Sequence, residues 1–503
     1  MGAAAPGPAL QRVPLDEVDE ANAGRGARPR TAVQNAARVA GAWSGWHARS
    51  PSRAVALLVG ALALVVGLAV ATPAAVAAYE RSTVLRPAAF DGAIRYAGAE
   101  PAVRWTTPVD TAVAPLLAGD TLVVATGTGP HDRSLTGLDV VTGAVRWTVP
   151  LGSSPPAQDV RCLLVAERVA CTVGAEAGTG RAAVRSRAEP PGPVPAARLL
   201  LVDPRTGAVL HRGATPGNVV SVATADGLGG DVVLAAIAHD VLTIRRVEPE
   251  TGRLRWEARR PSAFPASPTS RVHLQVGGGL VVATAEGSTI VVRAADGTRV
   301  PPPSDAVGTD ETFLRSDGTL VRTRYRLHTV GVDVVSELSD GSGDPWLTVR
   351  GVPVEPAVSD GASGLVFTSS TLAGGPLAGR VRAYLPDRPD AVWHALTPSR
   401  EIAADVAGRV VLRAAGALVG LDAGSGETVW RRTFGLGMGS VFSDGRLVVV
   451  QRTTPDDGAV LLALDLVDGR TRWVADLPHD TRTVVRLGSH LYAMTEDALA
   501  ALR

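Results

Sequence analysis

The chain repeats one short pattern: an apolar residue, Asp, two residues, Thr-Gly, three residues and Trp. The clearest copy runs from Leu138 to Trp147. A fixed period of this kind indicates a repeat architecture before any single residue is interpreted. The repeat positions are Asp139, Gly143 and Trp147; Asp203 and Gly207; Gly252 and Trp256; Asp422, Gly426 and Trp430; and Asp465, Gly469 and Trp473.

Each copy predicts a β-hairpin. The apolar residues before the Asp, as in 460–464, are typical of a strand. In Asp-x-x-Thr-Gly, the Asp and Thr side chains can hydrogen-bond the backbone of a turn, and Gly adopts its left-handed conformation without strain. The residues ending in Trp then form the next strand. Because a second hairpin usually precedes this one, each unit predicts a four-stranded blade.

The spacing of the copies supports this interpretation. Neighbouring Trp-equivalent positions are 37 to 64 residues apart, and most gaps are near the 40–50 residues that a propeller blade needs. The longest gap contains 174–197, whose Ala, Gly, Pro and Arg content predicts a disordered loop. The copies at Pro301, Trp346 and Trp393 are degenerate and are placed by spacing. The Trp-equivalent positions are Trp105, Trp147, His211, Trp256, Pro301, Trp346, Trp393, Trp430 and Trp473.

The two ends of the repeat region predict how the ring closes. Trp105 has an outgoing strand but no full blade before it, and 484–502 holds about three strands with no Trp after them. Pairing the first strand with the last three would remove an exposed sheet edge. The literal count is nine outgoing strands, but propellers typically have four to eight blades. We therefore predict an all-β, eight-bladed propeller with four-stranded antiparallel blades, with seven blades as the alternative.

The repeat resembles that of the pyrroloquinoline-quinone-like (PQQ-like) β-propellers over residues 100–503. That group includes quinoprotein dehydrogenases and the propeller subunit of the bacterial outer-membrane assembly machinery. The resemblance implies that the repeat Trp packs between adjacent blades. The chain is similar to a non-enzymatic, membrane-anchored, actinobacterial-type member of the group. The fold alone does not imply an activity, because one fold hosts many functions.

An uncharged apolar run at 54–78 is long enough to cross a bilayer as a helix. Arg38, Arg49 and Arg53 precede it, which places the N-terminus in the cytoplasm and the propeller outside. The alternative is a cleaved signal peptide, since 75–77 fits a small-residue cleavage site. We favour an uncleaved anchor, because the preceding segment and the apolar run are both longer than a signal peptide needs.

The predicted domains follow from these features. Residues 1–53 form a disordered cytoplasmic tail, 54–78 a transmembrane helix, 79–99 a linker and entry strand, and 100–503 the propeller. The predicted location is the plasma membrane, with a single pass and an extracytoplasmic propeller. The formal net charge of +1 gives no overall attraction to nucleic acid.

The two cysteines, Cys162 and Cys171, predict a disulfide. A hairpin centred on a two-residue turn at Ala166 and Glu167 places them opposite each other in a non-hydrogen-bonded pair, where Cα atoms approach most closely. A disulfide persists outside the cytoplasm. The alternative is a pair of small buried thiols.

The search for catalytic chemistry finds no site. The nine His form no His-x-His or His-Glu-x-x-His pattern, so no metal site is predicted. In the quinoprotein dehydrogenases, the resemblance implies a disulfide between adjacent cysteines beneath the quinone and a metal held by carboxylate and amide groups. Here the cysteines are nine positions apart, and Asn218 is the only Asn in 100–503. We therefore predict no catalytic residue, no cofactor and no metal.

The sequence thus predicts a membrane-anchored propeller that acts as a scaffold binding a protein or cell-envelope partner. One alternative is a quinone-dependent oxidoreductase or a relic of one. Another is an extracellular sensor coupled through the membrane helix to the tail. Function is expected where the copies depart from the pattern, as at His211, Pro301 and the loops between blades.

Overall fold

The computed structural model describes one of two compact units of the chain, Tyr79–Arg503. The described residues are those of 88–503 except 89, 96, 111–112, 128–132, 152–159, 174–197, 215–218, 225–227, 239–240, 262–271, 286–287, 302–308, 329–330, 343, 371–379 and 455–457. The predicted tail 1–53, membrane helix 54–78 and loop 174–197 lie outside this set. In the described part, no helix is long and apolar enough to span a membrane, so the helical element of the predicted fold is not found there.

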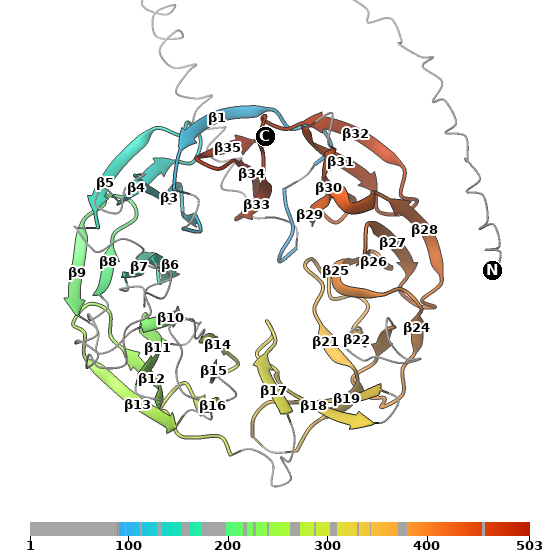
Figure 1. Cartoon of the computed structure of the whole chain (residues 1–503), viewed down its shortest axis with the longest axis horizontal. Helices are drawn as coiled ribbons and strands as arrows, with labels where there is room; N and C mark the ends of the chain where they lie inside the picture. Colours follow the sequence, from blue (N-terminus) through green and yellow to red (C-terminus); the bar gives the residue numbers. More distant parts are fainter. Residues whose placement is uncertain are drawn as a thin grey trace, which may run out of the picture. The chain divides into compact units, whose positions relative to one another are not determined.

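The described strands form nine antiparallel sheets arranged around a ring (Figure 1). We number these blades 1 to 9 in chain order. Blades 1 to 4 comprise β2 (Leu116–Ala118), β3 (Thr121–Thr126), β4 (Ser134–Asp139) and β5 (Val145–Pro150); β6 (Val160–Val165), β7 (Arg168–Val173), β8 (Arg198–Val202) and β9 (Val209–Ala214); β10 (Val219–Ala223), β11 (Val232–Ala238), β12 (Val241–Val247) and β13 (Leu254–Pro261); and β14 (His273–Gly277), β15 (Leu280–Ala285) and β16 (Ser288–Arg293).

Blades 5 to 9 complete the ring. They comprise β17 (Thr309–Leu314), β18 (Leu320–His328), β19 (Gly331–Ser339) and β20 (Leu347–Arg350); β21 (Val352–Val354), β22 (Val366–Ser369), β23 (Val381–Tyr384) and β24 (Trp393–Ala395); β25 (Ser399–Val406), β26 (Arg409–Ala414), β27 (Ala417–Asp422) and β28 (Thr428–Thr433); β29 (Met438–Ser443), β30 (Leu447–Thr454), β31 (Gly458–Asp465) and β32 (Thr471–Asp476); and β33 (Thr483–Leu487), β34 (His490–Met494) and β35 (Ala498–Leu502) with β1 (Val103–Pro108). A 3₁₀ turn, η1 (Gly435–Gly437), joins β28 to β29.

The prediction of eight blades, or seven, is wrong. The structure has nine sheets among its described residues, one for each outgoing position in the literal count. The usual range of propeller sizes led us to discount one degenerate copy. Degenerate copies still build sheets, because strand pairing depends on backbone hydrogen bonds and not on the repeat side chains. Blade 4 is the weakest: it has three strands among the described residues, and Pro301, which has no N–H to donate to a sheet, stands at its Trp position.

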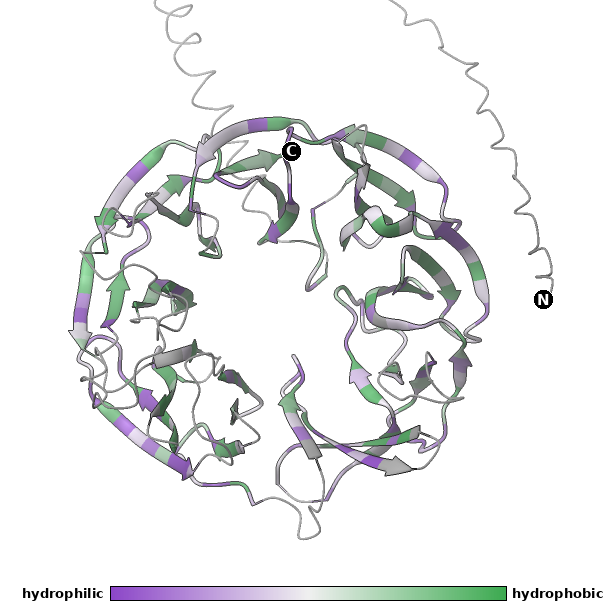
Figure 2. Cartoon of the chain, viewed as in Figure 1, coloured by the Kyte–Doolittle hydropathy of each residue, from purple (hydrophilic) through white to green (hydrophobic). Residues whose placement is uncertain are grey.

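The strands differ in burial according to their place in the blade. The second and third strands, such as β3 and β4, are almost wholly buried, because neighbouring blades cover both of their faces. The outer strands, such as β5, alternate between buried and exposed residues. Figure 2 shows the same contrast, with purple and green alternating along β1, β5 and β13 on the rim of the ring. The core is therefore a series of apolar layers between blades.

The ring closes as the sequence predicts, by pairing the first strand with the last three. β1 pairs antiparallel with β35, and Trp105 lies opposite Ala501. The residues before β1 (90–95 and 97–102, the entry segment) also bind blades 8 and 9. In that segment the Ile94 N–H donates to the Ser443 carbonyl at 2.8 Å, and the Arg95 N–H to the Ser489 carbonyl at 2.7 Å.

Candidate functional site: the seam between blades 2 and 3

Six repeat Trp side chains hold neighbouring blades together in the same way. Each indole N–H donates to a backbone carbonyl of the next blade, and we call this contact between two blades a seam. The carbonyl belongs to the residue after the repeat Asp position or, where the ring closes, to Ala97. A buried indole needs such an acceptor, so the bond fixes both the ring and the turn that it meets. The pairs are Trp105 with Val140 (3.3 Å), Trp147 with Pro204 (2.6 Å), Trp256 with Ala294 (3.0 Å), Trp393 with Ala423 (2.7 Å), Trp430 with Leu466 (2.9 Å) and Trp473 with Ala97 (2.6 Å).

The pair of Trp473 and Ala97 forms the same contact at the point where the ring closes. In blade 9 the third and fourth strands, β35 and β1, are far apart in the sequence, so no repeat turn joins them. The entry segment takes that place, and Ala97 supplies the carbonyl that Trp473 needs. The Ala97 N–H in turn donates to the carboxylate of Asp444 at 2.8 Å.

The repeat Gly is required for two reasons. Its φ is positive, near 70°, in every well-formed copy. It also lies against the Trp of the preceding blade. A Cβ atom on Gly426 would lie 2.6 Å from the Trp393 indole, and one on Gly469 would lie 2.7 Å from the Trp430 indole. Gly143 and Gly207 stand in the same relation to Trp105 and Trp147.

The repeat Asp residues cap their own turns. Oδ1 of Asp139 accepts from the N–H groups of Val141 and Thr142, both at 3.0 Å. Burial acts to raise the pKa of Asp139, but these bonds and one from the Arg146 guanidinium outweigh it, so the pKa is lowered. Asp203, Asp422 and Asp465 accept from their turns in the same manner. The carboxylates are occupied within the turns, as structural groups.

Three blades depart from this seam. Blade 4 has Pro301. In blade 5 the expected Trp346 is 45% exposed and does not enter the seam, whereas its neighbour Leu347 is 4% exposed and does. Placing this copy by spacing was therefore wrong by one residue. Blade 2 has His211, and a cavity lies at this departure.

The cavity has a volume of about 180 Å³ and lies between β8 and β9 of blade 2 and β11 to β13 of blade 3. His211 leans towards its own strand: a Cβ atom on Gly213 would lie 2.5 Å from its Nε2, whereas one on Gly252, across the seam, would lie 3.8 Å away. The imidazole is smaller than an indole and leaves the space next to Gly252 open. Leu199, Leu234 and Leu254 contribute apolar walls.

Two charged side chains also line this cavity. Arg245 on β12 and Glu257 on β13 lie opposite each other in the sheet register and form an ion pair at 2.5 Å. Burial acts to raise the pKa of Glu257, but hydrogen bonds from Arg245 and Arg259 outweigh it and lower the pKa. Our sequence analysis missed both residues. Counting outward from the turn before Trp256 does not find the pair, because a β-bulge between Arg246 and Val247 shifts the register by one residue.

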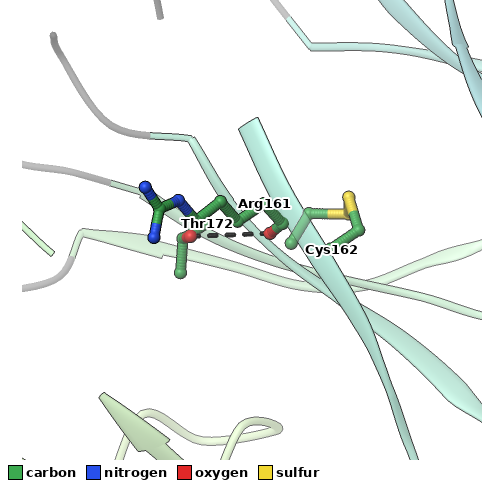
Figure 3. The surroundings of a disulfide bond; sticks show 4 residues. Arg161, Cys162 and Thr172 are labelled. Carbon is green, nitrogen blue, oxygen red and sulfur yellow. Dashed lines mark hydrogen bonds between the residues drawn. A yellow bond between two sulfur atoms is a disulfide. The ribbon is translucent and has the colours of Figure 1, made fainter. Parts of the chain in front are cut away.

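A disulfide joins Cys162 and Cys171 on the facing strands β6 and β7 (Figure 3). Their Cα atoms are 4.1 Å apart, and the turn between the strands is made by Ala166 and Glu167, both with positive φ. The bond crosslinks one hairpin of blade 2, the blade that also carries His211.

Three segments, 45–187, 180–302 and 377–502, match the family described as outer membrane protein assembly factor BamB. Together they span more than half of the chain. The chain belongs to this family. The predicted PQQ-like propeller repeat is thereby confirmed. A search of curated protein sequences gives no match.

Several solved structures resemble the chain. BamB from Moraxella catarrhalis is 12% identical and covers 80% of this chain and 99% of its own, with a TM-score of 0.43. A eukaryotic initiation factor is 11% identical and covers 82% and 92%, with a TM-score of 0.45. A europium-containing methanol dehydrogenase is 11% identical and covers 69% and 72%, with a TM-score of 0.36. Likenesses at this level do not bear on function.

The residues of the chain do not fit the quinone and metal of the PQQ-dependent enzymes. Its one cysteine pair crosslinks a hairpin, so the disulfide between adjacent residues that those enzymes place beneath the quinone cannot form. Within the described residues, no group of three His, Cys, Asp or Glu side chains could hold a metal ion. Asn218 lies outside the described residues.

Proposed function

We propose that the chain is a propeller scaffold that binds a protein partner of the cell envelope and catalyses no reaction. Membership of a family described as an outer membrane assembly factor supports an envelope role. The observation that carries the proposal is a pair of exposed leucines. Leu396 follows β24 and is 73% exposed, and Leu436, in η1 after β28, is fully exposed.

The two leucines belong to equivalent connections of neighbouring blades. Each connection leads from the outer strand of one blade to the inner strand of the next, so the two emerge on the same face of the ring. Large apolar side chains exposed on one face of a rigid scaffold are candidates for contact with a protein partner. Half-buried Phe434 and Met438 lie beside Leu436 in the chain and pack onto the core below it. This gives the surface a fixed base.

The test is site-specific photo-crosslinking in intact cells, with the photoreactive residue at position 436 or 396. We expect one discrete crosslinked protein from these positions. The matched control is position 145, because Val145 is 61% exposed but lies at the start of β5, at the other face of the ring. A crosslink from position 145 that equals those from 396 and 436, or no crosslink from either leucine, would refute the proposed face.

We further propose that 54–78 anchors the propeller in the plasma membrane, with 1–53 in the cytoplasm and the propeller outside. The uncharged apolar run and the arginines that precede it support this arrangement. Reporter fusions provide the measurement: alkaline phosphatase joined after Arg503 should be active and remain with the membrane after an alkaline carbonate wash. Removal of 1–78 should release the propeller. Recovery of the full-length fusion in the wash would contradict an anchor.

A further inference from the structure

The cavity at the seam of blades 2 and 3 lies where the other well-formed seams hold an indole. In those seams a Cβ atom on the facing Gly would meet the Trp ring at 2.7 Å (Gly207) or 2.9 Å (Gly297). Facing Gly252, the nearest atom of His211 would lie at 3.8 Å. Gly252 keeps the same φ, 70°, so the turn retains the shape that accommodates an aromatic ring.

The hydrogen-bond acceptor for an indole is also retained. By the rule of the other seams, the acceptor is the carbonyl of the residue after Glu248, which is Pro249. This residue is buried in the turn whose Gly252 lines the cavity, and no described residue donates to its carbonyl. The Pro249 carbonyl can therefore accept a hydrogen bond from a ligand N–H.

His211 adds a second polar group at the same place. No described residue donates to its ring or accepts from it. A neutral imidazole offers one N–H donor and one acceptor. The ring is therefore free to bind an edge of a polar heterocycle.

The volume agrees with a small guest. A cavity of about 180 Å³ is close to apolar cavities of roughly 150 Å³ that bind benzene in other proteins. Part of the lining is apolar, and the charges of Arg245 and Glu257, which also line the cavity, already satisfy each other. Nothing in the lining selects for a net charge on the guest.

We propose that this seam binds a small, uncharged, planar aromatic heterocycle that carries a ring N–H, of the size of indole. The guest stacks against Gly252 in the position that a Trp side chain occupies at other seams. Its N–H donates to the Pro249 carbonyl. The substitution of His for Trp at position 211 thus converts a structural seam into a binding site.

The test is calorimetric titration of the full-length protein in detergent with indole. We expect saturable binding with one site per chain. 1-Methylindole, which has no N–H, should bind roughly threefold to tenfold more weakly, the loss of one hydrogen bond. This comparison uses the unaltered protein and requires no variant to fold. No saturable indole binding, or equal affinity for the two compounds, overturns the proposal.

Two variants locate the site. His211→Trp supplies the missing indole from the chain itself and should abolish binding. Trp430→His, at a seam whose Trp430 N–H reaches Leu466, should add a second site of the same kind. Indole binding that persists in a folded His211→Trp protein would place the ligand elsewhere and overturn the proposal.

Discussion

The sharpest prediction concerns the two roles of the repeat glycine, which blade 7 allows to be separated. Gly426 has a φ of 71° and lies against the Trp393 indole, where a Cβ atom would meet ring atoms at 2.6 to 2.8 Å. Gly408, in the same blade, has a φ of 73° and no atom within 4 Å of such a Cβ. The two positions share the backbone strain and differ in the contact.

The magnitudes follow from this difference. An Ala in the left-handed region costs about 1–2 kcal/mol of stability, and the reduced entropy of the unfolded chain offsets about 0.4–1 kcal/mol of that cost. Gly408→Ala should therefore destabilise the ring by about 0–1.6 kcal/mol. Gly426→Ala adds overpacking against a buried ring, which costs about 1–3 kcal/mol. The second variant should be less stable than the first by that amount.

The assay is urea unfolding of both variants, followed by circular dichroism, with the free energies compared at equal slope. The contact can be tested further by Trp393→Ala, which removes the ring. In that background Gly426→Ala should cost no more than Gly408→Ala. Equal destabilisation by Gly426→Ala and Gly408→Ala would refute the packing role of Gly426. Its positive φ would then be the only reason why glycine is required there.

Three further predictions address other parts of the seams. The pKa of Asp465 is lowered chiefly by its hydrogen bond from Arg472. The contribution of Asp465 to stability is therefore present above about pH 3.9, the pKa of an unfolded Asp, and is lost as the pH falls through the lower pKa of the folded state. Asp465→Asn should flatten the pH dependence of the free energy of unfolding in urea in that acidic window only. Replacing Cys162 and Cys171 by Ser should lower the free energy of unfolding by about 2–3 kcal/mol, and dithiothreitol should destabilise the native protein but not this variant. Trp430→Phe leaves a buried carbonyl without its donor and should cost about 1–3 kcal/mol in the same urea assay, and no loss would show that the bond does not hold the seam.

Much of the propeller could be predicted because its signal is local. Asp139, Gly143 and Trp147 occupy one hairpin, and the backbone preferences of turn residues act within a few positions. The closure was also predictable, since an incomplete blade at each end leaves unpaired strands that can only pair with each other. The number of blades was predicted wrongly, because we gave the usual size range of propellers more weight than the spacing of the repeats, which was correct.

The binding site was only half visible in the sequence. His211 could be recognised as a departure from the repeat, because the other copies define what is expected there. The cavity that results could not be predicted, because it depends on Leu199 and Leu254 from different blades and on the direction in which the His211 imidazole points. Trp346 shows the same limit, since a strand reverses its exposed and buried faces when its register moves by one residue.

The sequence by itself determined the hairpins, the closure and the positions of the joints, because each depends on side chains within one turn or on the period between turns. The tertiary structure alone decided what those joints do to one another. A repeat Gly is required by a Trp from another blade, Ala97 completes a seam with Trp473 from the far end of the chain, and an exchanged His opens a cavity. These effects arise from close packing between segments distant in the sequence. The period of the repeat does not indicate which distant residues pack against each other.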